Sequence, residues 1–264
     1  MRLLNVHADL DRFFHHVACA PERVLFLDYD GTLAPFHVDP ARARPYPGVA
    51  QALAALSGSR GTRVVIVSAR RIGDLRGMLA GIRHDEAWGA HGRERAAPRG
   101  PVTEFAPEEA ATRQLALAEA PARQLAFGGA RVERKPASVA MHWRGLAPPR
   151  AQLVRERLLH AWREIADASV ELLPFDEGME MRARGRDKGD AVREVLAGCS
   201  RETACAYLGD DFTDEDAFDA LRGRGLAVLV RPELRETGAD LWLKPPRELL
   251  AFLRRWAAAA KRGR

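Results

Sequence analysis

Short apolar runs alternate with segments of helical periodicity along the N-terminal third of the chain. Apolar residues recur at near-helical spacing over residues 3–17, which predicts a first helix. Residues 24–27 and 64–67 are apolar throughout, which is typical of strands buried on both faces of a parallel sheet. Helical patterns follow these runs at residues 47–56 and 72–79. This order predicts an α/β fold with a doubly wound parallel sheet.

The pattern changes after about residue 95, where a stretch rich in proline and glycine from Pro98 to Pro107 indicates a linker. A helix and two short strands of alternating polarity follow, and the same order then occurs once more. The expected elements are a helix at 108–125, strands at 131–134 and 138–143, a helix at 151–166, and strands at 170–173 and 179–183. Such alternation is typical of antiparallel strands with one exposed face. We therefore expect an inserted α+β cap domain at residues 98–183, between core segments 1–97 and 184–264.

The first pattern resumes in the C-terminal part of the chain. The expected elements are helices at 188–196, 214–221 and 247–259, and buried strands at 204–208 and 226–230. Because these strands have the same apolar character as the first two, we expect all of them in one core sheet.

Composition narrows the class of protein. The chain has 264 residues, of which 47% are hydrophobic and 29% charged, as is ordinary for a folded protein. Its formal charge is +5, and the arginines that dominate its basic residues are scattered, so we expect no nucleic-acid partner. No apolar run is long enough to span a membrane. Asp9 and Asp11 occupy the place where a signal peptide needs its apolar centre, so we expect a cytoplasmic protein.

The chain has three cysteines, and their spacing fits neither a disulfide framework nor a zinc site. Only four of its 41 basic residues are lysines, so the position of each lysine is informative.

Two aspartates directly follow the first predicted strand. Asp28 and Asp30 lie two residues apart, so their side chains point the same way if the extended geometry continues. Open α/β sheets bind ligands at the carboxyl ends of their strands, and Gly31 allows a sharp turn there. One aspartate could attack phosphorus, and its neighbour could act as general acid and base. The alternative is a simple strand-end turn, which Asp and Gly also favour.

Two further positions suit a phosphorylated ligand. Ser68 follows the second predicted strand, where its hydroxyl could bond a phosphoryl oxygen, and Arg70 could orient an anionic or polyhydroxyl substrate. Lys188 begins a predicted helix and could neutralise phosphoryl charge and keep the attacking carboxylate ionised. The alternatives are a helix N-cap at Ser68 and a solvated charge at Lys188.

An acidic cluster follows the third predicted strand of the core and contains Asp210, Asp211 and Asp214. Clustered carboxylates are costly unless a cation balances them. Mg²⁺ takes a few carboxylate oxygens together with water and substrate phosphate, so Asp28 with Asp210 or Asp214 would suit it. Helix capping that starts at Thr213 is the alternative for part of the cluster, but it does not account for Asp210 and Asp211.

In this order, the motifs resemble those of the haloacid-dehalogenase-like phosphatases, which have a Rossmann-like core. The catalytic residues that the resemblance implies are Asp28 as nucleophile, Asp30 as general acid and base, Ser68 and Lys188. The Mg²⁺ ligands that it implies are the Asp28 carboxylate, the Asp30 backbone carbonyl and Asp210, with Asp211 and Asp214 in support.

Nearly the whole chain is similar to the trehalose-6-phosphate phosphatase family within that superfamily. The stretch from Glu133 to Arg144 resembles the lid signature of the family, and residues 89–92 match its Gly-x-His-Gly element. Together with Arg70, the substrate-binding residues that the resemblance implies are His91, Glu133, Lys135, Arg144 and Glu180. The chain departs from the family at Ala69, where Gly is usual, and at Ala183, where Pro is usual.

These features lead to the hypothesis of a Mg²⁺-dependent phosphatase that converts trehalose 6-phosphate to trehalose and phosphate through an aspartyl-phosphate. The inserted domain would be a lid that selects the phosphorylated disaccharide. A trehalose-phosphate synthase of the same pathway is a candidate partner.

Three alternatives stay open. The same chemistry could act on another sugar phosphate or on a glycosyl-glycerate phosphate, or the chain could be a non-catalytic sugar-phosphate-binding regulatory subunit. For the strands of the inserted domain, the alternative to substrate binding is that Arg134 and Arg182 form cross-strand ion pairs.

Overall fold

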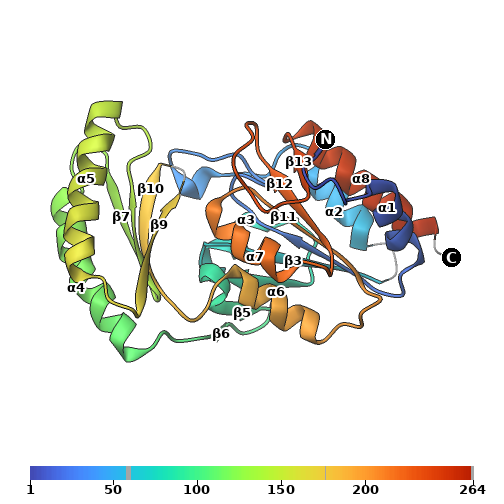
Figure 1. Ribbon diagram of the computed structural model, residues 1–264, viewed down its shortest axis with the longest axis horizontal. Helices are drawn as coiled ribbons and strands as arrows, with labels where there is room; N and C mark the ends of the chain where they lie inside the picture. The colour runs from blue at the N-terminus through green and yellow to red at the C-terminus, as the bar shows by residue number, and fades with distance from the viewer. Residues whose placement is uncertain (58–60, 176, 263–264) are drawn as a thin grey trace. The chain divides into compact units, whose positions relative to one another are not determined.

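The computed structural model divides into two compact units (Figure 1). It describes residues 1–57, 61–175 and 177–262. Unit 1 comprises Met1–Thr103 and Lys188–Arg264, and unit 2 comprises Glu104–Asp187. These boundaries lie a few residues from the expected positions 98 and 183. No helix within the described ranges is both long and apolar enough to cross a membrane.

Unit 1 is built on a mixed sheet whose six middle strands run parallel. In sheet order, the described strands are β1 (Arg2–Leu3), β13 (Leu241–Leu243), β12 (Leu226–Val230), β11 (Ala204–Gly209), β2 (Arg23–Leu27), β3 (Thr62–Val67), β4 (Glu86–Gly89), β5 (Glu94–Ala96) and β6 (Thr103–Glu104). Strands β2, β11 and β12 are buried along their whole length, as their apolar sequences predict. β1 and β5 add antiparallel neighbours to the two ends of the parallel part.

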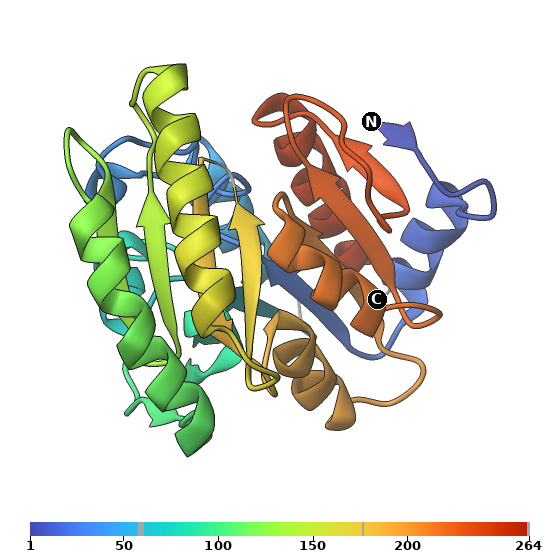
Figure 2. The same ribbon diagram turned by 60° about the vertical axis from the view of Figure 1, so that its left-hand side comes forward.

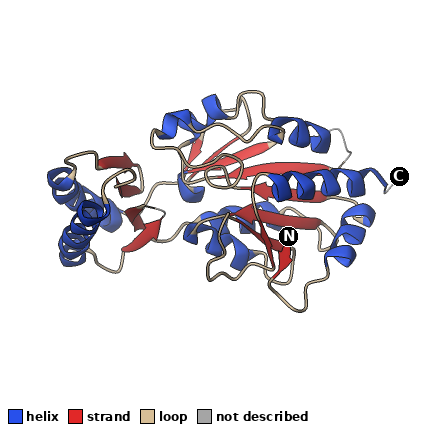
Figure 3. Ribbon diagram, turned by 90° about the horizontal axis from the view of Figure 1, so that it is seen from above, coloured by secondary structure: helices blue, strands red, loops and turns tan. Residues whose placement is uncertain are grey.

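Helices cover both faces of this sheet (Figure 3). They are α1 (Leu10–Cys19), α2 (Val49–Ser57), α3 (Ile72–Met78), α6 (Lys188–Ala197), α7 (Glu215–Ala220) and α8 (Arg247–Arg262), with 3-10 turns η1 (Pro40–Arg42), η2 (Ala90–Gly92) and η3 (Phe212–Asp214). Alternation along each strand separates the two faces. Leu25 and Leu27 belong to a core that includes Phe252 of α8, whereas Tyr207 of β11 meets Phe218 of α7 edge-to-face with ring centroids 5.8 Å apart.

Unit 2 is an antiparallel sheet covered by two helices. Its strands, in sheet order, are β7 (Arg131–Lys135), β8 (Ser138–His142), β10 (Gly178–Ala183) and β9 (Val170–Phe175), and its helices are α4 (Glu109–Leu125) and α5 (Pro148–Ile165). The helices lie side by side along the same face of the sheet (Figure 2). Met141 and Met181 pack with Trp162 of α5 in this core. Residues at alternate positions, such as Lys135 and Glu180, therefore belong to the opposite face.

The predicted doubly wound α/β fold is confirmed, and the differences concern short elements. The helix expected over residues 3–17 begins only at Leu10, because Asp9 caps it by accepting hydrogen bonds from two backbone N–H groups, and residues 2–3 form β1 instead. The proline-rich stretch expected to be a linker contains β6, which extends the core sheet beside β5.

Candidate active site

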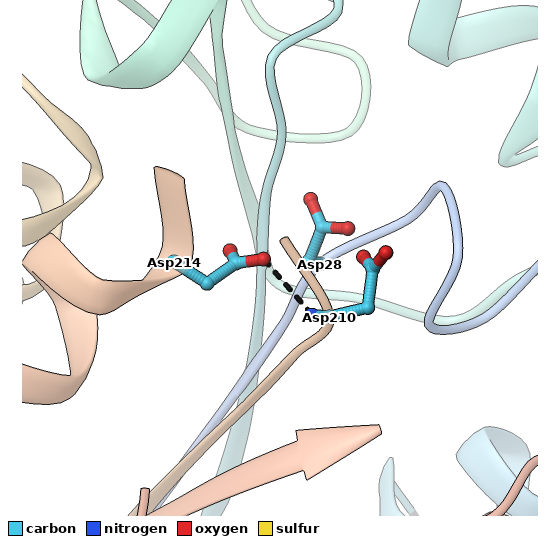
Figure 4. A group of neighbouring side chains, drawn as sticks. All are labelled: Asp28, Asp210 and Asp214. Atoms are coloured by element: carbon cyan, nitrogen blue, oxygen red, sulfur yellow. Dashed lines mark hydrogen bonds between the residues drawn. The ribbon is translucent and has the colours of Figure 1, made fainter. Parts of the chain in front are cut away.

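Asp28 and Asp210 lie side by side because the strands that carry them are neighbours. β2 pairs with β11 in parallel register, with Leu27 opposite Leu208. The backbone N–H of Asp28 continues the ladder and donates to the Leu208 carbonyl over 2.9 Å. Both aspartates therefore follow strand ends at the carboxyl edge of the sheet, where ligands bind in folds of this class. Figure 4 shows their two carboxylates projecting to the same side.

Lys188 joins this pair from the first position of α6. Its ammonium group donates to Asp28 Oδ1 over 3.0 Å and to Asp214 Oδ1 over 2.7 Å. The side chain is 2% exposed, so the alternative of a solvated charge is wrong. Strand-end positions predicted that Asp28 and Asp210 lie close together, and the start of a helix was expected for Lys188; the structure connects Lys188 to Asp28 directly.

Asp214 has a full set of hydrogen bonds to the protein. Besides Lys188, Oδ1 accepts from the Tyr207 hydroxyl over 2.6 Å. Oδ2 accepts from the Asp210 N–H over 3.0 Å (Figure 4) and from the Asp211 N–H over 2.9 Å. Four donors leave little capacity for a further partner. This arrangement favours an orienting role for Asp214. It fixes Lys188 and the backbone of the acidic loop, the segment after β11 that contains Asp210 and Asp211.

Two glycines make room for the carboxylates. Gly31 has φ +79°, which side-chain-bearing residues rarely adopt, and a Cβ there would overlap the Asp210 carboxylate. A Cβ at Gly209 would overlap the Asp214 carboxylate. The glycines of both motifs therefore serve the packing of the acidic groups as well as the turns.

Burial raises the pKa values of the two neighbouring carboxyl groups. It raises the pKa of Asp28 to about 8, against the opposing charge of Lys188, and Asp214 adds to the rise. Burial also raises the pKa of Asp210 well above its usual range, with further contributions from Asp28 and Asp214. Burial alone would lower the pKa of Lys188, but the two carboxylates it contacts outweigh this and raise it. The cluster therefore carries more negative charge than one ammonium group can balance.

The residues present fit a divalent metal ion. Asp28, Asp210 and Asp214 offer carboxylate oxygens that all lie within 4.8 Å of one another. Among the residues that the structure describes, Asp210 Oδ2 is buried and has no hydrogen-bond partner, and Oδ1 is reached only weakly by the Thr32 hydroxyl at 3.4 Å. A buried carboxylate oxygen without a donor is costly, and hard oxygen ligands are those that Mg²⁺ prefers. Since Asp214 is saturated, Asp28 and Asp210 are the better side-chain ligands.

Asp30 and Arg70 form an ion pair at the side of this cluster. Arg70 Nε and Nη2 donate to the two oxygens of Asp30 over 2.5 and 2.6 Å, in a bidentate arrangement. The backbone N–H of Arg70 donates to the Ser68 hydroxyl over 3.2 Å. Ser68 is not the N-cap of α3, a position that Arg71 occupies. Arg70, whose contact with substrate stays a prediction, thus also contacts the predicted general acid.

His91 lies in a turn with an unusual backbone. Ala90 and His91 have φ +48° and +55°, a conformation that is rare for residues other than glycine. The N–H of Ala90 donates to the Arg70 carbonyl and that of His91 to the Ser68 carbonyl, over 2.7 and 3.1 Å. The turn thus fixes the loop that carries Ser68 and Arg70, and backbone contacts of this kind were not apparent from the sequence.

In unit 2, three of the predicted sugar-binding residues lie on the sheet face opposite its helices, namely Glu133, Lys135 and Glu180. They take part in two polar pairs. Lys135 donates to Glu180 Oε1 over 3.1 Å, and the Ser138 hydroxyl donates to the same oxygen over 2.5 Å. Glu133 pairs separately with His142, whose Nε2 lies 2.9 Å from Oε2. Glu133 and Lys135 share a strand face, as expected.

Other residues of this sheet follow different patterns. Arg182 donates two hydrogen bonds to Glu171, its cross-strand neighbour, over 2.9 and 2.8 Å, so the ion-pair alternative is confirmed there. Arg134 donates to the Ser138 carbonyl over 2.9 Å. Arg144 lies in the turn after β8 and is half-buried.

The Glu133–His142 pair has shifted pKa values. Burial would raise the pKa of Glu133, but the hydrogen bond with His142 and the charge of Lys135 outweigh it and hold the pKa at about 2. Burial lowers the pKa of His142, against the effect of Glu133. At neutral pH, Glu133 is thus a carboxylate that accepts a hydrogen bond from a neutral imidazole.

The sequence pattern of the trehalose-phosphatase family matches residues 26–237, which include both the acidic cluster and the sheet of unit 2. The chain belongs to the trehalose-phosphatase family. It is 34% identical over 256 residues to a trehalose-phosphate phosphatase of Mycolicibacterium paratuberculosis, covering 90% of this chain and 63% of that protein. The chain therefore spans less than two thirds of this relative.

Two solved structures from Candida albicans have a similar fold. The C-terminal domain of a trehalose-6-phosphate phosphatase of Candida albicans matches with a TM-score of 0.82 at 22% identity, over 98% of this chain and 99% of that one. The C-terminal domain of a trehalose synthase regulatory protein of the same yeast matches with a TM-score of 0.68 at 18% identity, over 92% and 97% of the two chains. At these identities, the likeness concerns the fold.

In this member of the trehalose-phosphatase family, helix capping falls on different residues from those expected. Asp211 is the N-cap of η3, and its side chain and that of Asp214 form a capping box, because the helical turn begins at Phe212. The expectation that capping starts at Thr213 and does not account for Asp211 is wrong.

Sequence reasoning also missed Tyr207 and Arg235. Tyr207 is a polar residue inside an apolar strand, which was a weak signal, and no motif marked Arg235. The latter donates hydrogen bonds to the carbonyls of Asp210 and Asp211 from the loop between β12 and β13.

Proposed function

We propose that this chain is a Mg²⁺-dependent phosphatase that hydrolyses trehalose 6-phosphate to trehalose and inorganic phosphate. The observation that carries the proposal is the buried group of Asp28, Asp210 and Lys188 at the carboxyl edge of the core sheet, where one Asp210 oxygen lacks a donor among the described residues. A strand-end turn would need no buried lysine, and a passive binding site would need no carboxylate placed to attack. Membership of the trehalose-phosphatase family supports the same conclusion.

In the proposed reaction, a carboxylate oxygen of Asp28 attacks phosphorus, and the bond between phosphorus and the sugar oxygen breaks. Asp30 gives its proton to the departing sugar oxygen. Asp30 then takes a proton from water, whose oxygen attacks phosphorus, breaks the bond to Asp28 and releases inorganic phosphate. Lys188 orients Asp28 and offsets the charge of the phosphoryl group, and the Ser68 hydroxyl donates to one of its oxygens.

Asp28, Asp210 and the Asp30 carbonyl would hold the Mg²⁺ ion. When bound, the ion supplies positive charge that favours ionised carboxylates and stabilises negative charge on the phosphoryl oxygens. The raised pKa of Asp28, about 8 without an ion, is consistent with this requirement, because only the ionised carboxylate is a nucleophile.

The ion pair between Asp30 and Arg70 suggests how the general acid is held in position. A carboxylate that makes a bidentate pair with a guanidinium has a defined orientation. We propose that Arg70 holds Asp30 in place between proton transfers, in addition to the substrate contact that the sequence suggests. The positive-φ turn at His91 supports the loop that carries Arg70.

We propose that unit 2 is the cap that selects the sugar. Glu133, Lys135 and Glu180 combine hydrogen-bond acceptors and donors on one sheet face, as recognition of a polyol needs. Arg144 and His91 complete the predicted contacts. A trehalose-phosphate synthase is the partner that would supply the substrate, and the cytoplasmic location expected from the sequence stays a prediction.

Two rivals deserve a direct test. The same chemistry on another sugar phosphate requires only different contacts in the cap. A non-catalytic regulatory role is suggested by one structural neighbour, a trehalose synthase regulatory protein of Candida albicans, although its 18% identity concerns the fold alone. The buried Asp28–Lys188 pair favours catalysis, because binding alone needs no nucleophile.

The experiment is a substrate panel with and without EDTA, with phosphate release as the readout. The panel contains trehalose 6-phosphate, glucose 6-phosphate, a glucosyl-glycerate phosphate and p-nitrophenyl phosphate. We expect trehalose 6-phosphate to have the highest kcat/KM, EDTA to abolish turnover, and Asp28→Asn to lower kcat by about 10⁴-fold or more. Another preferred sugar phosphate would replace the substrate assignment, and binding without phosphate release would support the regulatory role. Normal turnover by Asp28→Asn would exclude the aspartyl-phosphate mechanism.

A further inference from the structure

Arg235 is a nearly buried arginine that binds the backbone of the acidic loop. It lies between β12 and β13, and its side chain is 11% exposed. Nε donates to the Asp210 carbonyl over 3.2 Å, and Nη2 donates to the Asp211 carbonyl over 2.7 Å. One guanidinium group thus holds two successive carbonyls of the segment that carries the predicted metal ligand. Arg231 Nη1 adds a weaker contact to the Asp210 carbonyl at 3.3 Å.

Further contacts fix Arg235 itself. Nη1 forms an ion pair with Glu215 at the start of α7, and the guanidinium lies over the Phe212 ring, 4.6 Å from its centroid. Glu215 also accepts from the Thr237 hydroxyl and from the Gly238 N–H, each over 2.8 Å. Both the arginine and the loop that carries it are therefore anchored to the same carboxylate.

The Asp210 side chain has little anchoring of its own. Oδ2 has no hydrogen-bond partner within the described part of the chain, and the contact from Thr32 to Oδ1 is long. The direction of this carboxylate therefore depends on the backbone from which it projects. That backbone is held on one side by Asp214, which accepts from the N–H of Asp210, and on the other by Arg235, which binds its carbonyl.

We propose that Arg235 is a positioning residue for the divalent cation site, because it fixes the backbone that directs the Asp210 carboxylate towards Asp28. The inference rests on the Mg²⁺ requirement in the proposed function. Metal sites need their ligands held within about 0.5 Å, and loss of an outer contact typically weakens metal binding about 10- to 100-fold. Lysine cannot replace the arginine fully, since a single ammonium group lacks the planar fork that reaches two carbonyls.

Arg23 provides a matched control. Its guanidinium also binds two successive backbone carbonyls, those of Val17 and Ala18, and the residue is 4% exposed. It begins β2, whereas Asp28 follows the last residue of that strand, so Arg23 lies at the opposite edge of the sheet from the acidic cluster. Replacing either arginine removes a buried guanidinium clamp, but only one of the two clamps holds the acidic loop.

The test measures binding of Mg²⁺ alone by isothermal titration calorimetry on the full chain, without any phosphate ester. The variants are Arg235→Met, Arg235→Lys and Arg23→Met, and urea denaturation reports the stability of each. We expect Arg235→Met to raise the Kd for Mg²⁺ about 10- to 100-fold and Arg235→Lys to raise it less. We expect Arg23→Met to lose stability but to keep the wild-type Kd.

A wild-type Kd for Mg²⁺ in folded Arg235→Met overturns the inference. If that variant does not fold, Arg235→Lys decides, and a wild-type Kd there overturns it equally. An equal loss of affinity in Arg23→Met would reduce Arg235 to a general stabilising role. Wild-type protein that binds Mg²⁺ but releases phosphate from no ester would end the proposed function alone, whereas wild-type protein that binds no Mg²⁺ would end both.

Discussion

The acidic cluster of unit 1 and the polar sheet face of unit 2 both bring carboxylates and cations together. Negative charge is in excess in the cluster, whereas the charges on the sheet face are balanced. In the cluster, the carboxylates of Asp28 and Asp214 contact the ammonium group of Lys188, and one Asp210 oxygen has no donor in residues 1–57, 61–175 and 177–262. Burial dominates there, so the pKa values of Asp28 and Asp210 rise. The cluster is therefore unfavourable as long as no further cation is bound.

On the sheet of unit 2, Glu180 and Glu133 each have a hydrogen-bond partner. Glu180 accepts from Lys135 and Ser138, and Glu133 contacts His142. The pKa of Glu133 falls to about 2 despite burial, because its neighbours favour the charged form. This face is already balanced, so a ligand has to exchange hydrogen bonds with it rather than supply charge.

The difference separates two kinds of site. A cluster with excess negative charge attracts a cation and then an anionic phosphoryl group, which suits chemistry. A balanced face offers donors and acceptors in fixed positions, which suits recognition of a neutral sugar. On this comparison, changes in the cluster should affect stability and catalysis on every substrate, whereas changes on the sheet face should depend on which substrate is tested.

Replacing Lys188 with Met should have the largest effect. It leaves the carboxylates of Asp28 and Asp214 without the ammonium group that both contact, and removing one partner of a buried ion pair typically costs about 3–5 kcal/mol. Urea denaturation in EDTA at pH 8 measures the loss, which should shrink at pH 5 as carboxylates become protonated. Lys261→Met, on the exposed end of α8, is the control. Equal stability of the two variants would contradict the charge balance described for the cluster.

Asp210→Asn should stabilise the protein without metal and remove its response to Mg²⁺. The pKa of Asp28 rises from 3.8 to about 8 on folding, so the folded state binds more protons between these values and stability falls as pH rises through them. Removing the neighbouring charge should recover about 1–3 kcal/mol at pH 8 in EDTA.

Denaturation at pH 5 and pH 8, with EDTA and with Mg²⁺, checks this prediction. Wild-type protein should gain stability from Mg²⁺ at pH 8, and Asp210→Asn should not. Asp219→Asn, at an exposed position of α7, is the matched control and should behave like wild type. A variant at position 210 that is less stable than wild type in EDTA would show that the carboxylate is not a source of repulsion.

On the sheet of unit 2, Glu180→Gln should discriminate between substrates. It removes the charge that Lys135 and Ser138 contact, and a hydrogen bond to a charged group is worth about 1.5–3 kcal/mol. We expect kcat/KM for trehalose 6-phosphate to fall by about tenfold or more, and that for p-nitrophenyl phosphate to stay unchanged. Glu171→Gln, which loses the pair with Arg182 on the same sheet, is the control. Equal losses on both substrates would argue against a sugar-selecting face.

The length of each strand explains which elements of the core sheet the sequence could predict. The long apolar strands β2, β3, β11 and β12 were foreseen because four or more consecutive apolar residues give a clear signal. The short strands β1, β5, β6 and β13, which lie at or next to the edges of the sheet, were not, since two or three residues are too few to show a period. The doubly wound fold followed from the long strands alone.

Within the site, strand ends predicted that Asp28 and Asp210 would be neighbours, because parallel strands align their carboxyl edges. Two contacts made by arginine side chains were not predictable. Arg70 pairs with Asp30 and Arg235 binds the acidic loop because of how loops pack, which no motif spacing records. The functional roles assigned to these residues stay predictions.

His142→Gln should have the smallest effect on stability. It tests whether the sheet face changes stability with pH in the opposite direction from the acidic cluster. Burial lowers the pKa of His142, so the folded protein binds fewer protons than the unfolded chain as pH falls below about 6.5, and stability is lost on acidification. Gln keeps an N–H near the position of Nε2 that can donate to Glu133 but does not titrate. Between pH 7 and pH 5.5, wild-type protein should lose a few tenths of a kcal/mol more than the variant.

The difference between wild type and His142→Gln is the quantity to measure, because Asp28 and Asp210 change stability in the opposite direction over the same pH range. Subtracting the two denaturation curves at each pH cancels the contribution of the cluster, provided that the two sites are independent. His160→Gln, at an exposed position of α5, should show no such difference. Identical pH dependence in wild type and His142→Gln would mean that folding does not change the pKa of His142. His142 would then have no part in the charge balance of the sheet face.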